Sequence, residues 1–174
     1  MSAAAVACLS GAIAASTAVF AVVDAVVLRP LPFAHARRLV AVWGVNPARD
    51  TVKRGFSWPD VRDIAHGVRT LDGVAAMSNA PDGLTLTSGS EPVRIPSRMV
   101  SGNFFDVLGV RASVGRTLSA DDDRPGSPAS VTISDALWRQ RFGADPGVTG
   151  RAVTLDGRPF RITGVARRGF AYPP

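Results

Sequence analysis

The amino-acid sequence predicts an α+β fold, in which one apolar helix precedes a domain of short helices and short mixed strands. The chain has 174 residues, 46% hydrophobic and 20% charged, which is long enough for one domain with its own core. The first 23 residues contain no charged side chain. Beyond them, short β-like runs alternate with helical segments that carry capping and stop residues.

The apolar start predicts a transmembrane helix within residues 1–28. From Ala3 to Val23 a helix rising about 1.5 Å per residue spans roughly the 30 Å of a bilayer's hydrocarbon core. Small residues recur at the spacing by which membrane helices approach closely, so we expect this helix to belong to a bundle. These small residues are Ala4, Ala7, Cys8, Gly11, Ala12, Ala15 and Ser16. A cleaved signal peptide is the competing interpretation, but no basic region follows Met1 and the apolar stretch is longer than a signal core.

A proline-containing connector is predicted over residues 29–37. Its centre is Arg29, Pro30, Leu31, Pro32 and Phe33, where two prolines fix extended backbone and end the helix. Because prolines transmit helix motion better than a flexible linker does, these five residues are the predicted coupling connector. Arg29, Arg37 and Arg38 alone favour a cytoplasmic location for this side of the helix.

The folded domain is predicted over residues 38–174, beginning with a buried strand at Leu39–Val45. Ser57–Asp60 forms a capping box, which indicates that a helix starts there. The apolar positions of this helix are three or four residues apart, and Gly67 is its predicted stop. They are Val61, Ile64, Ala65 and Val68.

Short strands are predicted next, with Ser88–Ser90 as a hairpin turn between the last two. They are Gly73–Met77, Leu84–Thr87 and Val93–Val100. Pro96 indicates an edge strand, because proline cannot donate to a ladder. Ser101–Gly109 is predicted as a short helix with a serine cap and a glycine stop.

The last third of the domain contains an acidic turn, a strand that leads into a helix, and a hairpin whose turn is Asp156–Gly157. The predicted segments are Asp121–Asp123, Ser130–Ile133, Ser134–Phe142 with Gly143 as its stop, Ala152–Leu155 and Pro159–Val165.

Few residues can carry chemistry. A single cysteine, Cys8, excludes an internal disulfide and a CxxC centre, and neither His35 nor His66 stands beside the partners that acid–base chemistry requires. No GxxxxGK[ST], GxSxG, HExxH or GxGxxG motif occurs, so we expect no ATP or NAD site, no cofactor and no enzyme activity. Asp121–Asp123 lack the alternating ligands of a calcium loop and are predicted to be a surface turn rather than a metal site.

The formal charge of +6 and the pI near 11.1 are compatible with nucleic-acid binding, but the basic residues stand singly or in pairs. We therefore predict a solvated basic surface and no nucleic-acid partner. Trp43, Trp58 and Trp138 lie on predicted elements, where core or interface packing is expected.

Several motifs follow one another in a specific order along nearly the whole chain. They are Val27–Phe33, Phe56–Asp63, Asn103–Val110, Gly115–Leu118, Asp121–Asp123, Leu137–Gly143, Gly150–Arg151 and Ile162–Val165. In this order they resemble the MacB-like periplasmic core domain of FtsX/MacB-type, acidobacterial-type ABC transporter permeases.

The resemblance implies a first membrane span, an extracytoplasmic α+β domain with βαβ-like units, and further spans or a second permease subunit. It also implies a separate or fused ABC ATPase and a periplasmic partner. The expected location is the bacterial plasma (inner) membrane with the domain outside, against the local charge count. The implied function is to couple ATP-driven helix motion to export or to that partner, with no catalytic residue carried over.

The chain departs from the family pattern at both ends, because Met1 lies inside the apolar stretch and Pro174 precedes any further span. A fragment, a mispredicted start and a degraded gene would each explain this departure, and we expect the domain to be incomplete at its carboxyl end. The alternative is a single-span, membrane-anchored extracytoplasmic protein-binding module without an ATPase. A hydrolase is disfavoured, because no set of nucleophile, base and orienting residue occurs.

Overall fold

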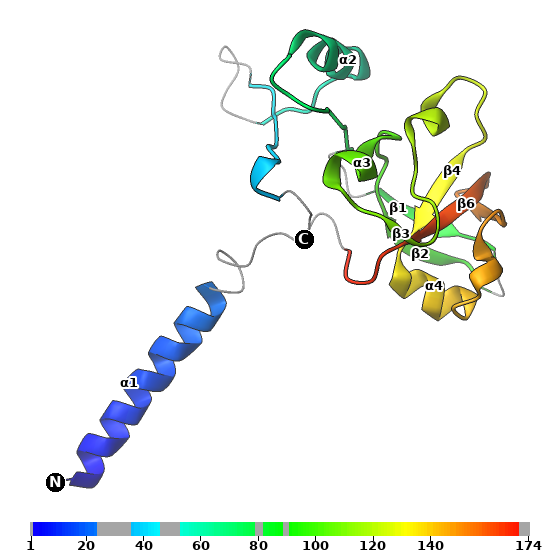
Figure 1. The fold of residues 1–174 in the computed structure, drawn as a ribbon. Helices are drawn as coiled ribbons and strands as arrows, with labels where there is room; N and C mark the ends of the chain where they lie inside the picture. Colours follow the sequence, from blue (N-terminus) through cyan, green and yellow to red (C-terminus); the bar gives the residue numbers. More distant parts are fainter. Residues whose placement is uncertain (1, 24–35, 46–52, 79–81, 89–90, 171–174) are drawn as a thin grey trace.

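The computed structural model describes residues 2–23, 36–45, 53–78, 82–88 and 91–170. Figure 1 shows an elongated first helix and a domain in which helices lie against a mixed sheet. The predicted α+β class is confirmed for this domain.

Helix α1 spans Ser2–Val23, and the hydroxyl of Thr17 within it donates to the carbonyl oxygen of Ile13 at 2.8 Å. The described side chains of α1 are exposed, among them Leu9, Ile13 and Phe20. No helix in the described part of the chain has the combined length and hydropathy of a membrane span.

The predicted buried strand at Leu39–Val45 is wrong. After the 3-10 helix η2 (Ala36–Arg38), the chain is irregular and exposed, and its one ladder contact is the bridge between Gly44 and Arg54. A strand persists only when a neighbour satisfies its backbone groups, and the described residues provide that neighbour at Gly44 alone. An apolar run by itself does not supply a partner strand.

Helix α2 (Trp58–Gly67) confirms the predicted capping box. The hydroxyl of Ser57 accepts the backbone N–H of Asp60, and the Asp60 carboxylate accepts the backbone N–H of Ser57. Val61 and Ile64 are half-buried, and no residue of α2 is fully buried. The helix therefore forms from local signals and packs only lightly within the described structure.

The described strands form one six-stranded sheet in the order β2-β1-β5-β6-β3, with β4 also paired to β6. Their bounds are β1 Asp82–Leu86, β2 Val93–Ser97, β3 Ala112–Gly115, β4 Ser130–Ile133, β5 Ala152–Leu155 and β6 Arg158–Ala166. β1 and β2 form the predicted antiparallel hairpin, and Pro96 lies on the edge strand β2, as predicted. The predicted strand at Gly73–Met77 is wrong, because only Met77 makes a bridge, to Val100.

Strand β6 pairs with three other strands of the described sheet. It is antiparallel to β5 and β3 and parallel to β4. Asp156 and Gly157 both have positive φ, at 45° and 76°, which confirms the predicted two-residue hairpin turn. The parallel pair β4–β6 is connected through helix α4 (Asp135–Phe142), so the chain contains a βαβ-like unit with β5 inserted.

The two remaining helices differ in how well their caps were predicted. Ser134, predicted as the first residue of this helix, is instead its N-cap and accepts the Leu137 N–H at 3.2 Å, while Gly143 ends the helix as expected. Helix α3 (Phe104–Leu108) ends at Gly109 in the left-handed region, as expected, but the predicted Ser101 cap is wrong. The Ser101 hydroxyl instead accepts the N–H of Ala76 and donates to the side chain of Asn103.

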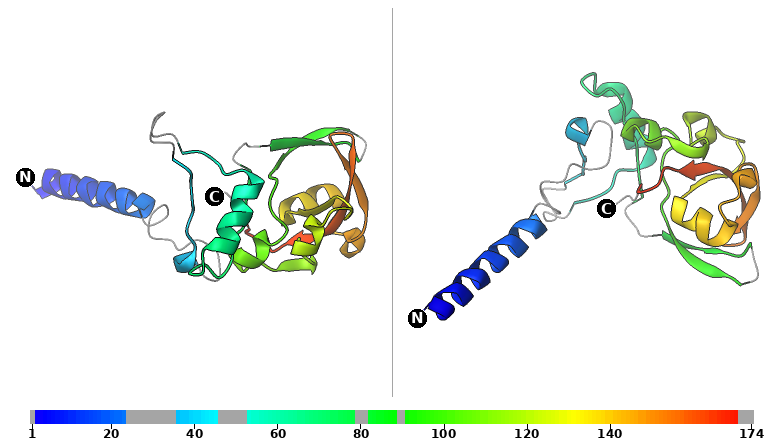
Figure 2. Two further views of the ribbon diagram at one scale, coloured as in Figure 1. Left: turned by 90° about the horizontal axis from the view of Figure 1, so that it is seen from above. Right: turned by 60° about the horizontal axis from the view of Figure 1, so that its bottom comes forward.

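Two hydrophobic clusters stabilise the domain. One lies between the sheet and helix α4, which Figure 2 shows beside the strands. The first packs α4 against the sheet and consists of Leu86, Ile133, Trp138, Val148, Val153, Leu155, Ile162 and Val165. The second is centred on α3 and has Phe104, Phe105, Leu108 and Val110 as its buried members.

Candidate functional site

The predicted coupling connector Arg29–Phe33 lies outside the described residues, so its role stays a prediction. The nearest described residues on its two sides are Val23, which ends α1, and Ala36, which begins η2. The candidate site therefore begins at Ala36, where the described chain enters the domain.

The first residues described after α1 contact the second hydrophobic cluster, which is centred on α3. Ala36 and Leu39 are both partly buried and pack against the buried side chains of α3. Phe104 and Phe105 lead this cluster, with ring centroids 5.6 Å apart in an edge-to-face arrangement. A displacement of residues 36–39 would therefore act directly on packed side chains rather than on a solvated loop.

The described chain also ends on this cluster. Phe170, which follows strand β6, packs against Phe105 with a centroid separation of 5.7 Å and an interplanar angle of 52°. The start and the end of the described domain thus meet on one helix. We call this set the end cluster and define it as Ala36, Leu39, Phe104, Phe105, Leu108, Val110 and Phe170.

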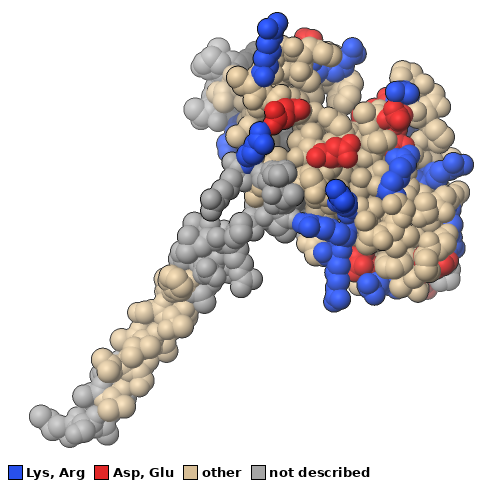
Figure 3. All heavy atoms as spheres, viewed as in Figure 1, with Lys and Arg blue, Asp and Glu red and all other residues tan. Residues whose placement is uncertain are grey.

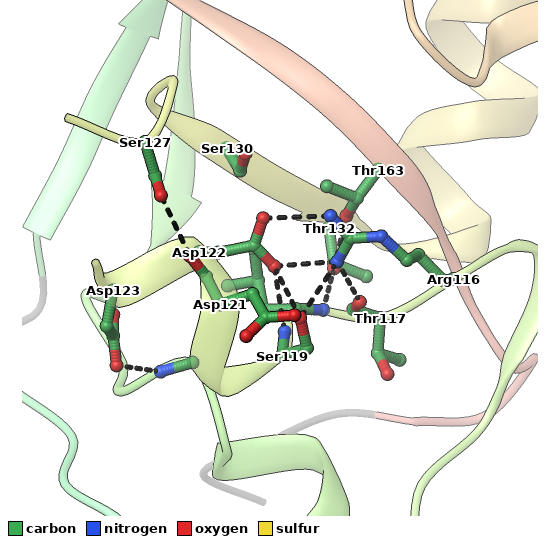
Figure 4. A network of polar contacts seen from close by, with 12 residues as sticks. Arg116, Thr117, Ser119, Asp121, Asp122, Asp123, Ser127, Ser130, Thr132 and Thr163 are labelled. Carbon is green, nitrogen blue, oxygen red and sulfur yellow. Dashed lines mark hydrogen bonds and ion pairs between the residues drawn. The ribbon is translucent and has the colours of Figure 1, made fainter. Parts of the chain in front are cut away.

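A polar network ties the end cluster to the sheet (Figure 4). The Arg116 guanidinium donates to both carboxylate oxygens of Asp122, at 2.6 and 2.9 Å. Asp122 also accepts the Ser119 N–H at 2.8 Å, within the 3-10 helix η3 (Ala120–Asp123) and its cap. The next residue, Asp123, accepts the Gly102 N–H immediately before α3 at 2.6 Å.

The same network reaches the strands. The Leu118 N–H donates to the hydroxyl of Thr132 on β4 at 3.1 Å, and this hydroxyl lies 3.1 Å from that of Thr163 on β6. The Arg116 N–H donates to the Thr163 carbonyl oxygen at 3.0 Å. Residues 116–123 therefore connect the start of α3 to two strands of the sheet through hydrogen bonds. We call residues 116–123 the polar staple.

The Arg116 guanidinium lowers the pKa of Asp122 well below its usual range, and the Ser119 N–H acts in the same direction against the opposing effect of partial burial. The Asp122 side chain is only 11% exposed, whereas Arg116 is 55% exposed. Asp122 is therefore a charged structural residue at neutral pH.

The acidic run forms a turn with structural contacts, which agrees with its interpretation as a turn. Asp121 makes an exposed ion pair with Arg124 at 2.8 Å, while Asp122 and Asp123 make the contacts given above. Within the described residues, no group of three His, Cys, Asp or Glu side chains is placed to hold a metal ion. His66 is exposed in the last turn of α2, and His35 lies outside the described residues.

The three tryptophans have different surroundings. Trp138 is buried, and its indole N–H donates to the carbonyl oxygen of Asp145 at 2.8 Å, as expected for a core residue. Trp43 and Trp58 are 42% and 49% exposed. The strand that was predicted to contain Trp43 does not form. The Lys53 ammonium lies 5.8 Å from the centre of the Trp43 ring.

Trp43 and Trp58 belong to a part of the chain that we call the exposed arm, the described residues 39–45 and 53–68. Figures 1 and 2 show it apart from the strands of the sheet. Its exposed large apolar side chains are Val40, Val42, Trp43, Val45, Phe56, Trp58 and Val68. Exposed large apolar side chains are typical of an interaction site where they form a contiguous patch.

The contacts described above are those of packed apolar side chains, hydrogen bonds and ion pairs. Figure 3 shows α1 without charge on the visible face and basic and acidic side chains over the visible face of the domain. The end cluster was missed by sequence reasoning, because nothing in the spacing of Leu39, Phe105 and Phe170 indicates that they meet.

Comparison with known proteins places these features in a family context. The family model described as the MacB-like periplasmic core domain matches residues 2–173. A search of curated proteins finds no match.

Two solved structures resemble the chain. The extracellular domain of the noncanonic ABC-type transporter YknZ from Gram-positive bacteria is 25% identical, with a TM-score of 0.56. The match covers 72% of this chain and 61% of that domain, so the chain spans less than two thirds of it. The periplasmic region of MacB from Actinobacillus actinomycetemcomitans is 22% identical with a TM-score of 0.48, over 64% of this chain and 56% of that one.

Proposed function

Since the chain belongs to the MacB-like periplasmic core domain family, we propose that it forms the first membrane span and the extracytoplasmic domain of an ABC transporter permease. In this role it relays ATP-driven motion of membrane helices to export or to a periplasmic partner, and it needs no bond chemistry of its own. The family match over nearly the whole chain and the likeness to the YknZ extracellular domain support a transporter component.

The end cluster is the observation that carries the coupling proposal. Ala36 and Leu39, in the first described part of the chain after α1, pack against the same buried cluster as Phe170. A packed cluster transmits displacement because its side chains cannot yield independently. The rigid connector at Pro30 and Pro32 would deliver the motion of the first helix to this cluster.

The proposed organisation follows from the sequence. Residues 1–28 contain the membrane span, residues 29–37 the connector, and residues 38–174 the extracytoplasmic domain. The absence of charge from Ala3 to Val23 and the 22-residue length of α1 support the span. The proposed partners are other permease spans or a second permease subunit, an ABC ATPase and a periplasmic protein. The proposed location of this chain is the bacterial plasma (inner) membrane, with its main domain extracytoplasmic.

Cysteine labelling tests this topology directly. Cys8 is the one native cysteine, so Cys8→Ser gives a background free of thiols. In that background we expect Met99→Cys, whose native side chain is 75% exposed, to react with a membrane-impermeant maleimide in intact spheroplasts. Leu9→Cys is the matched control within α1, where lipid should block the reagent. Reaction of Met99→Cys only after lysis would contradict the proposed location.

The exposed arm favours a second candidate, a membrane-anchored extracytoplasmic binding module without an ATPase. Both candidates predict the same labelling pattern, but only the permease predicts an ATPase partner. Detergent-solubilised protein from its native host should co-purify with an ABC ATPase if the permease assignment is correct. Purification without any ATPase, at preserved folding of the domain, would favour the binding module.

A further inference from the structure

The described domain contains two bodies, each packed around its own hydrophobic cluster. The sheet body is the six-stranded sheet with helix α4 and Arg116, whose backbone N–H donates to the carbonyl oxygen of Thr163 on β6. The α3 body is residues 101–110 and 118–123, on which the remaining residues of the end cluster pack. Each body has buried apolar members of its own, so each core can stay packed while the other moves.

Residues 118–123 belong to the α3 body because they contact the start of α3 closely. Leu118 packs against the second cluster, and the Gly102 N–H donates to the carboxylate of Asp123 at 2.6 Å. A Cβ atom on Gly102 would overlap the backbone carbonyl of Ser119. Contacts this close leave no room for the two segments to shift against each other, so we expect them to move together.

The polar staple joins the two bodies through hydrogen bonds (Figure 4). From the sheet body, the Arg116 guanidinium donates twice to Asp122 and, at 3.4 Å, to the hydroxyl of Ser119. From the α3 body, the Leu118 N–H donates to the hydroxyl of Thr132 at 3.1 Å. We call these four hydrogen bonds the latch. The Arg116 side chain is 55% exposed, so water beside the latch can replace its bonds when they break.

Each half of the latch keeps a hydrogen-bond partner of its own when the latch opens. On the α3 body, the Asp122 carboxylate still accepts the Ser119 N–H, which lies 2.8 Å away. On the sheet body, the Thr132 hydroxyl still has the hydroxyl of Thr163, which lies 3.1 Å away. Opening therefore exchanges a few hydrogen bonds for bonds to water, which costs less free energy than separating either apolar cluster.

We propose that the α3 body moves as one piece against the sheet body, and that the latch holds the two bodies in one arrangement until it opens. The inference deepens the proposed function and rests on it for the source of the movement, because Ala36 and Leu39 would deliver the motion of the first helix to the α3 body. Phe170 packs on the same body, so the end of the described chain would move with it. The test of the movement itself requires neither a membrane span nor an ATPase.

Pulsed electron paramagnetic resonance on the full chain in mild detergent measures distances between and within the bodies. In the Cys8→Ser background, spin labels at Asp106→Cys and Arg141→Cys report the distance between the bodies, because the two native side chains are exposed on α3 and α4. Asp106→Cys with Ala120→Cys reports a distance within the α3 body. Arg141→Cys with Arg158→Cys reports a distance within the sheet body. Ala120 and Arg158 are also exposed, so none of the labels disturbs a core.

The latch variant is Arg116→Gln with Thr132→Val. We expect it to raise the fraction of open molecules at least about tenfold, because it removes charge-assisted hydrogen bonds and a neutral one. A second distance should then appear between the bodies, while both distances within a body stay as in the native chain. Arg124→Gln with Thr149→Val is the matched control, since Arg124 makes an exposed pair with Asp121 and Thr149 is exposed. The control should keep a single distance.

Three results would overturn the inference. An unchanged distance between the bodies in the latch variant would show that the latch does not control their arrangement. Equal broadening of all three distances would show that these hydrogen bonds hold the whole domain together rather than two bodies. A second distance in the control variant would show that the effect is not specific to the latch. None of these results bears on the cysteine-labelling or ATPase co-purification tests, so the two proposals fail separately.

Discussion

The rings of Phe105 and Phe170 lie with their centroids 5.7 Å apart, which joins the last described residue of the domain to helix α3. Ala36 and Leu39 pack on the same cluster, so the described domain begins and ends at one place. Under the proposed coupling, a movement of α1 would thus reach both ends of the described domain together. The predictions below test this cluster, the polar staple beside it and the connector that leads to it.

Truncation of the Phe105 side chain should lower the free energy of unfolding of the domain. Phe105 is 7% exposed, and Phe105→Ala should lower the free energy of unfolding by about 3–5 kcal/mol through lost burial and a cavity. Phe170→Ala, at a half-buried ring, should lower it by about half as much. Denaturant unfolding of the full chain in detergent, followed by fluorescence of buried Trp138, measures both. Met99→Ala, at an exposed side chain, is the control and should change it by less than about 0.5 kcal/mol.

Gly102 should tolerate no side chain. A Cβ atom there would overlap the backbone carbonyl of Ser119, where residues 116–123 dock against the start of α3. Gly102→Ala should therefore lower the free energy of unfolding by about 2–3 kcal/mol, since backbone atoms must move. Gly67→Ala is the matched control, because nothing lies within 4 Å of its added methyl group. Equal unfolding midpoints for the two variants would contradict the close docking of the staple.

The ion pair between Arg116 and Asp122 should contribute measurably to stability. Asp122→Asn weakens two charge-assisted hydrogen bonds from Arg116 and one from Ser119, so it should lower the free energy of unfolding by about 1–2 kcal/mol. Asp121→Asn serves as the control, because Asp121 is 70% exposed and its pair with Arg124 is solvated. A loss of stability in Asp121→Asn as large as that in Asp122→Asn would show that the staple is not specific.

The same pair predicts an acid dependence. The pKa of Asp122 is lowered in the folded protein by the Arg116 hydrogen bonds, so its contribution to stability is complete above the ordinary value of 3.8. It is lost as the pH falls below that value toward the lowered pKa, where the folded carboxylate takes up a proton. The stability difference between the native chain and Asp122→Asn should therefore shrink between about pH 4 and pH 2. A difference that stays constant over this range would contradict the assignment.

Local signals predicted much of the fold, because they act within a few residues. The capping box at Ser57 and Asp60, the hairpin turn at Asp156–Gly157 and the edge position of Pro96 all follow from hydrogen bonds or torsion angles of neighbouring residues. The strand at Leu39–Val45 failed for the opposite reason, since strand formation depends on a partner that sequence periodicity does not reveal.

The site was less predictable than the fold. Ser101 was assigned as a helix cap from its residue type, but its hydroxyl bonds to Ala76, which comes from a different segment. The contacts of Phe105 with Phe170 and of Gly102 with Asp123 also join residues distant in sequence. Such contacts depend on tertiary packing, which one sequence specifies only through its complete fold.

The proline connector is the most direct point at which to test the coupling mechanism. In the complete permease with its ATPase, Val45→Cys in the Cys8→Ser background reports on the exposed arm through its rate of maleimide labelling. We predict that ATP changes this rate when Pro30 and Pro32 are present. Pro30→Gly with Pro32→Gly should reduce the change several-fold while ATP hydrolysis continues, because glycine makes the connector flexible. The same ATP-dependent change with either connector would contradict coupling through residues 29–33.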